Sequence, residues 1–491
     1  MSLVDYFLIP LSPLIALVVA GILLIVLECF KKPVSNQTKL FVALLGPMAS
    51  AGMATWLSST WPIAYSSVGY SGSEVWLREF CRAYQLDRLS LSLIWGISVF
   101  SFLGVVFASG VRKLDDIRGE LFALLQFIAV GMMCLVTARN LLMVFVGLEL
   151  MSLPTYVLVG IRRDDRQSLE AGMKYFLFGS FATVLLLLGT VLLYSHFQST
   201  DLVRIGELLA IAKTKAEAPP VLVLSGIACI LISVTFKVGL VPFHMWLPDV
   251  YQGAPTAVTG FMGSAVKLAG FGLVMRLFWI AFLPLQPIWG GILDWLAVIS
   301  MFVGNIAAVI QPNLKRMFAY SSIAHAGYLM LGVSAVAKTG DLNSSTLVYY
   351  LMVYGLMFLG AFGVFSILED EDGITFENIA GFGFKHAFIG GCLAFFALSA
   401  AGIPPTPGFF AKYFVFLDAV SAGKTLWVVL AVISSAIGLF YYLKVLVYLY
   451  MKDAPAGGVK VSHVDRTIYL GILGCAIAMA VFALFPHRLG V

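Results

Sequence analysis

The sequence contains little charge for its length. Asp, Glu, Lys and Arg make up 12% of its 491 residues, whereas soluble domains average about 25%. Hydrophobic residues reach 60%, and the mean hydropathy is +0.96. These few charged side chains cannot cover the water-exposed surface of a soluble protein of this length. We therefore expect an integral membrane protein.

The sequence also lacks the alternating apolar and polar pattern of a membrane β-barrel. It contains continuous Leu, Ile, Val and Phe runs instead, and a helix needs about 20 such residues to cross a hydrocarbon layer about 30 Å thick. We therefore predict an all-α polytopic membrane protein with about fourteen transmembrane helices. The predicted spans are 11–30, 38–60, 86–109, 120–138, 141–160, 173–196, 221–250, 255–280, 291–311, 314–336, 345–368, 386–418, 425–450 and 466–485.

Cysteine is scarce and scattered. The six cysteines are Cys29, Cys81, Cys134, Cys229, Cys392 and Cys475. None has the paired spacing that zinc or an iron–sulfur cluster needs. No G-x-G-x-x-G or Walker motif stands between a strand and a helix. We therefore expect no cofactor and no metal in this chain. The run "FLIPLSPLIALVVAGILLIVLECF" lacks a basic leader and a small-residue cleavage site, so we expect a retained helix rather than a signal peptide.

The net charge of +5 lies mostly in short loops between predicted spans, so it does not indicate nucleic-acid binding. Loops after odd-numbered spans, such as "KKPVSNQTK" and "RRDDR", hold more Lys and Arg than those after even-numbered spans. The positive-inside rule then places the first loop in the cytoplasm and both termini on the outer side. The stretch "LEDEDGITFENIAGFGFKH" is an acidic exception, although acidic residues count for little under that rule.

Two predicted spans contain helix-breaking residues in matching places. They are "FKVGLVPFHMWLP" and "LSAAGIPPTPGFFAKYF", which align as GLVP at 239–242 and GIPP at 402–405. A proline inside a helix removes a hydrogen bond and clashes with the carbonyl four residues earlier. Both helices should therefore be broken, and the carbonyls of Val238, Ala400 and Ala401 should be free.

A weaker similarity pairs "NLLMVFVG" from Asn140 with "NLKRMFAY" from Asn313, each opening a span two places before a broken one. Matching interrupted helices in two halves of a transporter point to an ion site at the repeat interface. We predict two five-helix repeats, inverted because each holds an odd number of spans. The predicted segments are an N-terminal three-helix segment at 1–119, a first repeat at 120–280, a second repeat at 291–450, and a C-terminal loop with the last transmembrane helix at 451–491.

Four charged side chains lie inside predicted spans, where a charge at the helix centre costs about 2.5 to 3.5 kcal/mol. They are Glu149 in "VFVGLELMSLP", Lys237 in "LISVTFKVGLVP", Lys267 in "MGSAVKLAGFG" and Lys412 in "PGFFAKYFVFL". Each has a structural alternative, because a lysine near a span end can extend to the interface, and Glu149 with Lys237 can form a buried ion pair. Four together, two of them beside broken helices, favour a path for protons or cations.

Lysine suits proton transfer in hydrocarbon because burial disfavours the charged amine while a neighbouring carboxylate favours it. Moving the carboxylate therefore switches the amine between holding and releasing a proton. We predict that Glu149 modulates Lys237, that Lys267 is the next relay, and that Lys412 is the donor on the exit side.

Two histidines and a further lysine are additional candidates. His244 follows Lys237 by seven residues, and His325 lies in "AYSSIAHAGYLML". An unperturbed pKa of about 6.5 suits histidine to link lysines, with a packing role as the alternative. Lys444 takes roughly the place in the second repeat that Lys267 takes in the first, with extension to the interface as its alternative. Three other basic residues are predicted away from the path: Lys315 and Arg316 in a loop, and Lys174 at an interface.

The stretch "VPFHMWLPDVYQGAPTAVTGFMGSAVKLAGFG" resembles the antiporter-like membrane subunits of proton-pumping NADH:quinone oxidoreductase, respiratory complex I. Those subunits are similar to the large subunits of multisubunit cation/proton antiporters, and the H-x-W-x-P-D block is specific for the whole superfamily. Within it, "DVYQGAPT" resembles the bacterial subunit N type, whose mitochondrial counterpart is subunit 2. After the last span only "FPHRLGV" remains, which leaves no room for the long lateral helix of the subunit L type. The resemblance covers nearly the whole chain.

The resemblance implies fourteen helices, two inverted five-helix repeats that act as proton half-channels, and a buried axis through Glu149, Lys237, Lys267 and Lys412. It implies a proton-translocating subunit in a bacterial cell inner membrane, beside a neighbouring antiporter-like subunit and small membrane subunits. NAD, FMN, iron–sulfur clusters and quinone would be bound by partner subunits. This chain would then serve the enzyme as a translocase subunit without a redox centre.

Two alternatives use the same residues. A subunit of a multisubunit Na⁺ or K⁺/H⁺ antiporter would employ the same lysines, and only the "DVYQGAPT" variant separates it in the sequence. A purely structural scaffold of the membrane arm predicts instead that neutralising all four charges is harmless. Neighbouring genes for quinone-site and iron–sulfur subunits would favour the oxidoreductase, and a run of small antiporter genes would favour the antiporter.

Overall fold

The protein is all-helical in the part of the chain that the computed structural model describes, which comprises residues 8–29, 34–60, 83–110, 117–216, 218–340, 345–368, 374–454 and 466–486. These residues form no β-strand and only three isolated bridges. The predicted fold class is therefore confirmed. The α-helices are α1 Ile9–Glu28, α2 Asn36–Thr60, α4 Arg88–Ser109, α5 Arg118–Val136, α6 Leu141–Val159, α7 Arg166–Phe197, α8 Leu202–Thr214, α9 Val221–Val238, α10 Trp246–Gly253, α11 Thr256–Phe261, α12 Lys267–Arg276, α13 Gln286–Val309, α14 Leu314–Thr339, α15 Ser345–Leu368, α16 Phe382–Lys385, α17 Ala387–Ala401, α18 Pro407–Ser421, α19 Thr425–Met451 and α20 Arg466–Leu484.

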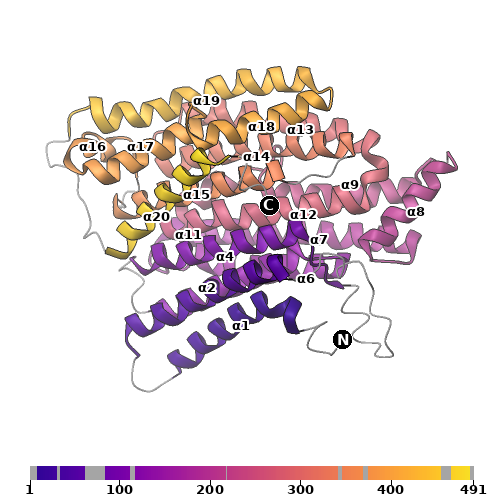
Figure 1. Cartoon of the computed structure of the whole chain (residues 1–491), viewed down its shortest axis with the longest axis horizontal. Helices are drawn as coiled ribbons and strands as arrows, with labels where there is room; N and C mark the ends of the chain where they lie inside the picture. The colour runs from indigo at the N-terminus through magenta and orange to yellow at the C-terminus, as the bar shows by residue number, and fades with distance from the viewer. Residues whose placement is uncertain are drawn as a thin grey trace.

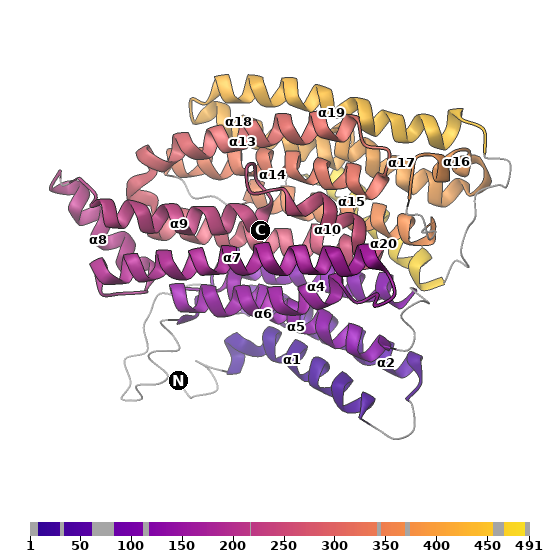
Figure 2. The same cartoon turned by 180° about the vertical axis from the view of Figure 1, so that it is seen from behind.

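The helices lie side by side in one bundle (Figure 1). α1 and α2 form one edge and α19 the opposite edge, with α6, α9, α14 and α18 between them in that order. Seen from behind, α7 runs along one face beside α9, on which it packs, and α8 extends beyond one end of the bundle (Figure 2). Residues far apart in the sequence can therefore line up across the bundle.

Twelve helices of the described chain are long and apolar enough to cross a membrane, or up to thirteen if the bent pair Glu377–Lys385 and Ala387–Ala401 forms one span. The sequence predicted about fourteen. The difference lies in α14, whose apolar run is interrupted by serines and His325, and in the twelfth predicted span, which divides into two helices of 15 residues. Large outward side chains such as Phe181, 63% exposed, suit a surface that faces lipid or another membrane subunit.

The two predicted helix breaks are confirmed. α9 ends directly before Gly239, and the chain becomes helical again in α10. In the same way α17 ends directly before Gly402 and is followed by α18. Both glycines adopt a left-handed conformation, with φ of 78° and 81°, which side chains other than glycine rarely allow. The proline that follows each glycine prevents the helix from continuing.

The similarity between the segments at Asn140 and Asn313 reflects one local structure formed twice. Each asparagine is the N-cap of its helix, α6 or α14, and its side-chain oxygen accepts a hydrogen bond from the backbone N–H three residues later. Each also forms an isolated antiparallel bridge, Asn140 with Asp201 and Asn313 with Thr375. The division into two five-helix repeats stays a prediction that this local match supports.

The predicted span 255–280 is not one regular helix. Between α11 and α12 lies a π-helical turn, Met262–Val266, and a second one, Leu277–Ala281, follows α12. π-helical turns are rare and occur frequently at functional sites. The first of them ends directly before Lys267, so the irregular backbone sits at one of the four predicted charges.

A buried ion pair joins α4 to the end of α12. Arg276 is 1% exposed and donates from Nη1 and Nη2 to the two carboxylate oxygens of Asp87, at 2.6 and 2.7 Å. Its Nε donates to the carbonyl of Val136 at 3.0 Å. Asp87 is also the N-cap of α4 and accepts from the backbone N–H of Ser90 at 2.8 Å. The pair therefore fixes three helix ends at once.

Replacing Arg276 by Met should lower the free energy of unfolding by about 3 kcal/mol, because it leaves Asp87 without its partner and the Val136 carbonyl without a donor. Thermal unfolding in detergent measures the effect. The matched control is Arg204→Met, whose ion pair with Glu207 is more than half exposed on both sides, so its removal should change stability by less than about 1 kcal/mol. Equal effects of the two substitutions would contradict the structural role of the Arg276 pair.

Candidate functional site

Lys237 lies in the last turn of α9 and is 6% exposed. Its Nζ donates to the hydroxyl of Ser152 at 2.7 Å and to that of Tyr175 at 3.2 Å. The rings of Tyr175 and Tyr156 lie 5.3 and 6.0 Å from the same nitrogen. Hydroxyl groups and aromatic faces, rather than a carboxylate in contact, therefore surround this buried amine.

Glu149 lies one helical turn before Ser152 on α6 and is half-buried. Its carboxylate accepts a hydrogen bond from Thr183 Oγ1 at 2.6 Å. Glu149 shares a face of α6 with Ser152, which contacts Lys237, yet no ion pair among the described residues joins Glu149 to Lys237. The structure thus brings the predicted modulator and its lysine together while leaving a hydroxyl group, that of Ser152, in the contact position.

A small cavity lies between Lys237 and Lys267. Its volume is about 10 Å³, and Tyr175, Trp246 and Tyr251 line it together with the apolar side chains of Val238, Leu247, Met262 and Val266. One water needs about 10 to 15 Å³, so the cavity offers space on the scale of a single water with an amine on either side. Trp246 stabilises the wall, because its ring stacks on Tyr175 at 4.5 Å and its Nε1 donates to a backbone carbonyl of α9 at 3.1 Å.

Lys267 is buried at the start of α12 and reaches toward the second predicted repeat. Its Nζ donates to both the backbone carbonyl and the hydroxyl of Ser322, on α14. The ring of Tyr354 lies 5.0 Å from the same nitrogen and 5.1 Å from the ring of His325. Lys267 therefore touches the residues that lead to His325.

His325 is buried one turn after Ser322, and both of its ring nitrogens have a partner. Nδ1 is hydrogen-bonded to the hydroxyl of Tyr350 at 2.8 Å, and Nε2 to that of Tyr442 at 3.1 Å. The Tyr442 hydroxyl is also hydrogen-bonded to Ser321. An imidazole engaged on both sides can take a proton at one nitrogen and release one at the other.

Lys412 is buried in the first turns of α18. Its Nζ donates to the carbonyls of Ala400 and Ala401, each at 3.1 Å, and to the hydroxyl of Ser435 at 3.0 Å. The two carbonyls that the proline pair was predicted to free are thus bonded by this lysine. The ring of Tyr328 lies 5.2 Å from the nitrogen, on the same helix as His325. The end of α17 also favours a cation through its helix dipole.

Glu149, Lys237, Lys267, His325 and Lys412 thus form one row of charged or titratable side chains. The structure does not bring His244 and Lys444 into this row. His244 lies half-buried in the break between α9 and α10, and its Nδ1 has no hydrogen-bond partner among the described residues. Lys444 is half-buried on α19, with Nζ 4.3 Å from the ring centre of Phe376. It stands two residues after Tyr442, which faces His325, so Lys444 points from a different side of α19.

The prediction that Lys315 and Arg316 lie in a loop is wrong. Both occupy the first turn of α14, because this helix begins one residue before Lys315. Lys315 is buried and donates to the carbonyl of Ala254 at 2.7 Å. Arg316 pairs with Asp249 at 2.6 Å, and Lys174 pairs with the same carboxylate at 2.8 Å. The aspartate of the H-x-W-x-P-D block therefore joins α7, α10 and α14.

The sequence analysis assigned no role to the hydroxyl groups that contact the buried amines, although the span of His325 has a Ser-rich polar face. Two of them carried a signal, because Ser152 stands three residues after Glu149 and Ser322 three residues before His325, which places each on the face of a recognised charge. Tyr354 and the other tyrosines carried no such signal, because an aromatic residue in an apolar span is equally expected to serve packing alone.

Among the described residues, no group of three or more His, Cys, Asp or Glu is placed to hold a metal ion. Five of the cysteines have free thiols in that part of the chain, and Cys81 lies outside it. Five of the basic loop residues used to orient the chain also lie outside the described residues: Lys31, Lys32, Arg112, Lys113 and Lys460. The buried lysines and His325 offer groups that can exchange protons.

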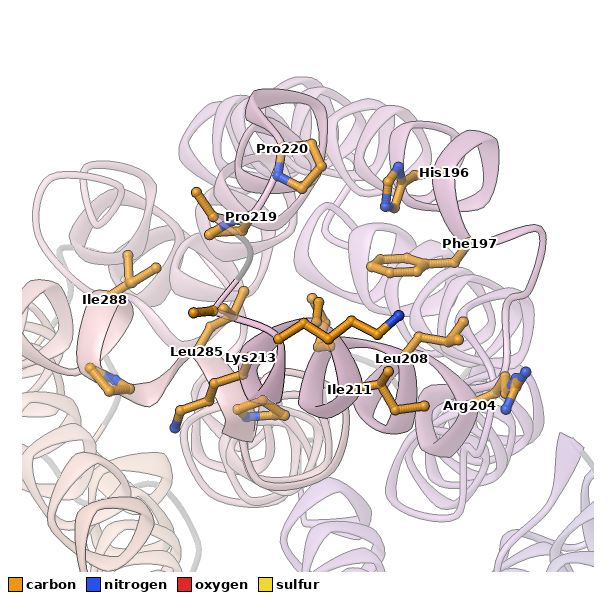
Figure 3. Close-up of a pocket in the computed structure, with 17 residues that line it drawn as sticks. His196, Phe197, Arg204, Leu208, Ile211, Lys213, Pro219, Pro220, Leu285 and Ile288 are labelled. Atoms are coloured by element: carbon orange, nitrogen blue, oxygen red, sulfur yellow. The ribbon is translucent and has the colours of Figure 1, made fainter.

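A cavity of about 680 Å³ lies away from this row, at the end of the bundle formed by α8 (Figure 3). The predicted spans left 197–220 as a loop, but its middle forms α8, which is capped by Asp201 and too short to cross a membrane. Arg204 and Lys213 of α8 and His196 of α7 line the cavity. None of the buried lysines opens into it, so it is separate from the candidate path.

Residues 138–438 match the protein family described as NADH:quinone oxidoreductase/Mrp antiporter, TM. Among curated proteins, NADH-quinone oxidoreductase subunit N 1 of Sorangium cellulosum is 37% identical over 97% of this chain and 96% of its own length. NADH-quinone oxidoreductase subunit N of Laribacter hongkongensis is 36% identical over 97% and 95%. Similarity to these relatives thus extends over nearly the whole sequence.

Two solved structures share the fold. One is a chain of respiratory complex I from Thermus thermophilus, with a TM-score of 0.79 and 28% identity, covering 97% of this chain and 98% of the other. The second is a chain of the Mrp complex from Dietzia sp., with a TM-score of 0.82 and 18% identity, covering 99% and 96%. At 18% identity the second likeness concerns the fold alone.

Proposed function

The chain belongs to the NADH:quinone oxidoreductase/Mrp antiporter family, within its subunit N group, and on that premise we propose how it moves protons. It is a membrane-arm subunit of a proton-translocating NADH:quinone oxidoreductase, and it works beside other antiporter-like membrane subunits. We propose that protons cross through the row formed by Glu149, Lys237, Lys267, His325 and Lys412.

The observation that carries this proposal is the continuity of the row. Lys237 and Lys267 share one cavity of about 10 Å³, and Lys267 contacts α14 one turn before His325. The rings of His325 and Tyr328 are 5.8 Å apart, and Tyr328 lies under the amine of Lys412. The space between Lys237 and Lys267 is on the scale of one water. Hydroxyl groups and aromatic rings lie along the steps from Lys267 to His325 and from His325 to Lys412, where water has to complete the hydrogen bonds that proton transfer requires.

The proposed transfer begins at Lys237. While Glu149 remains close, its negative charge favours the ammonium form of Lys237; when the carboxylate moves away, burial favours the neutral amine. The released proton passes through the cavity to Lys267, which must be neutral to accept it. From there the hydroxyl of Ser322 leads toward His325, and Lys412 receives the proton last. When the carboxylate moves back, Lys237 takes a new proton from one aqueous phase and Lys412 releases its proton toward the other, so each amine returns to its starting state.

We assign the two halves of this row to the predicted repeats. Residues 120–280 hold Glu149, Lys237 and Lys267 and form a first half-channel, and residues 291–450 hold His325 and Lys412 and form a second. His244 and Lys444 would then serve at the outer ends of these half-channels. We place the chain in a bacterial inner membrane with both termini on the periplasmic side, as the loop charges indicate.

The redox chemistry belongs to partner subunits in this proposal. NAD, FMN, iron–sulfur clusters and quinone would be bound there, and the signal would reach this chain as a change of charge or conformation at a neighbouring membrane subunit. Glu149 is the natural receiver, because it is half-buried and its only hydrogen bond among the described side chains is that from Thr183.

Purification through a tag on this chain tests the proposal. The chain should bring down an assembly that oxidises NADH, reduces quinone and acidifies the lumen of proteoliposomes when NADH is added. NADH should drive this acidification without sodium or potassium in the medium. Assembly with small antiporter subunits, and proton movement that needs a sodium or potassium gradient but not NADH, would support the antiporter alternative instead.

A further inference from the structure

The structure contains a second buried ion pair that the row does not include. Lys424, the residue before α19, donates from Nζ to the carboxylate oxygens of Asp294 on α13 at 2.5 and 2.7 Å. Their side chains are only 4% and 6% exposed. Lys424 also donates to the hydroxyl of Ser334 on α14 at 2.8 Å. Replacing such a pair by apolar residues of similar volume is often stabilising, so stability alone does not account for it.

Asp294 lies on the same face of α13 as a residue that reaches the row. Asn305, eleven residues later, donates from Nδ2 to the hydroxyl of Tyr328 at 3.0 Å, and Tyr328 lies under the amine of Lys412. Eleven residues make about three turns, so Asp294 and Asn305 share one face, about 16 Å apart along the helix. Val298 and Met301 occupy this face between them and are buried.

Asp294 also differs from the other carboxylates of the described chain. It is the only Asp or Glu among them that is fully buried. The second half-channel, with His325 and Lys412, contains no other buried acid in the described residues, whereas the first half-channel has Glu149 beside Lys237. A proton that leaves Lys412 needs an acceptor, and Asp294 is a buried carboxylate that can take it when its pair with Lys424 opens.

The pair lies near one face of the membrane. Lys338, in the exposed last turn of α14, lies close to the turn that holds Gly423 and Lys424. The chain segments before α13, after α14 and before α19 all follow even-numbered predicted spans. The loop charges place those segments on the outer side. The pair is therefore suitably placed between Lys412 and the outer aqueous phase.

We propose that Asp294 and Lys424 form the outer proton-transfer pair of the second half-channel, which rests on the proposed proton path. Lys412 gives up its proton and becomes neutral, water that enters beside Val298 and Met301 carries the proton, and the Asp294 carboxylate takes it to become a carboxylic acid. The loss of its negative charge separates it from Lys424, which stays an ammonium. Release of the proton to the outer side restores the ion pair and completes the transfer.

The decisive variant removes both charges at once, Asp294→Leu together with Lys424→Met, in the complete complex in inverted membrane vesicles. Because an ion pair replaced by apolar side chains of similar volume usually leaves the fold intact, the complex should assemble, as measured by NADH oxidation with a soluble artificial acceptor. NADH-driven proton uptake per assembled complex should fall at least fivefold. Normal uptake in this variant would overturn the proposal, since a purely structural pair predicts it.

The pair of buried Arg276 with half-buried Asp87 supplies the control. The double variant Asp87→Leu with Arg276→Met should lower the thermal stability and leave proton uptake per assembled complex near that of the unaltered protein. Lys237→Ala separates the two proposals: if it blocks pumping while the Asp294 double variant pumps normally, only the outer pair is wrong. If Lys237→Ala also pumps normally, the whole path is wrong.

A second measurement does not depend on loss of function. Asp294→Glu keeps the charge and should retain most proton uptake. In the infrared difference spectrum induced by NADH, the band of a protonated carboxyl group should shift between the unaltered complex and this variant, because the group that takes the proton has changed. Identical spectra would show that residue 294 does not take up a proton and would overturn the proposal.

Discussion

The complex that carries Lys237→Ala should assemble but pump protons about tenfold more slowly or worse, with quinone reduction slowed as well. The substitution removes the amine between Glu149 and Lys267, and the hydroxyls of Ser152 and Tyr175 that remain cannot hold a proton as a cation. The fold should survive, because alanine suits the last turn of a helix and no contacting carboxylate loses its partner. NADH-driven acidification, divided by the NADH oxidised with an artificial acceptor, measures the effect.

Glu149→Ala should give a similar loss, because Lys237 then lacks the charge that holds its proton. Lys213→Ala, on α8 and away from the row, is the control and should pump normally. If the Lys237 and Glu149 variants both assemble and pump at the normal rate, the path does not run through α9. If these variants lower only the yield of assembled complex, and each complex pumps normally, the two residues serve packing instead.

The broken helices and three of the buried lysines could be predicted because their signals are local. A proline disrupts the helix that contains it, and a charge inside an apolar run is costly whatever surrounds it. The same reasoning predicted free carbonyls at Ala400 and Ala401, which the structure confirms as acceptors for Lys412. It could not predict the donor, because that requires knowing how α18 returns toward the end of α17.

The outer pair of Asp294 and Lys424 could not be predicted, because its signal is not local. Asp294 stands near the start of a predicted span and Lys424 between two spans, where a charge has access to water and carries little cost. The two residues are also 130 positions apart in the sequence. Only the packing of α13 against α14 and α19 buries them together, and packing between helices leaves no mark in a single sequence.

The π-helical turn before Lys267 was missed for a related reason. Its sequence, Met262–Val266, contains no proline and reads as ordinary helix. In the structure it sits where α11 passes into α12, directly before the lysine that contacts Ser322 on α14. A π-helical turn inserts one residue and rotates everything after it, so it determines the direction in which Lys267 points. Such a rotation depends on the neighbouring helices rather than on local residue preference.

Lys412→Ala should reduce proton pumping about as strongly as Lys237→Ala, about tenfold or more, since it removes the amine at which the second half-channel receives its proton. It should also lower the yield of assembled complex, unlike Lys237→Ala. The carbonyls of Ala400 and Ala401 lose their donor at the buried end of α17, and an unsatisfied buried acceptor costs about 1 to 3 kcal/mol. The loss of assembled complex and the loss of pumping per complex therefore need to be distinguished.

Lys412→Arg separates them. A guanidinium can donate to both carbonyls and to Ser435, so the helix end keeps its hydrogen bonds and the complex should assemble at a yield closer to normal than with alanine. Arginine does not release its proton in proteins, because its pKa lies above about 12, so pumping should stay as low as in the alanine variant. An arginine variant that restored both yield and pumping would show that Lys412 acts only as a fixed cation at the end of α17, and the proton would then have to pass from His325 to Asp294 without it.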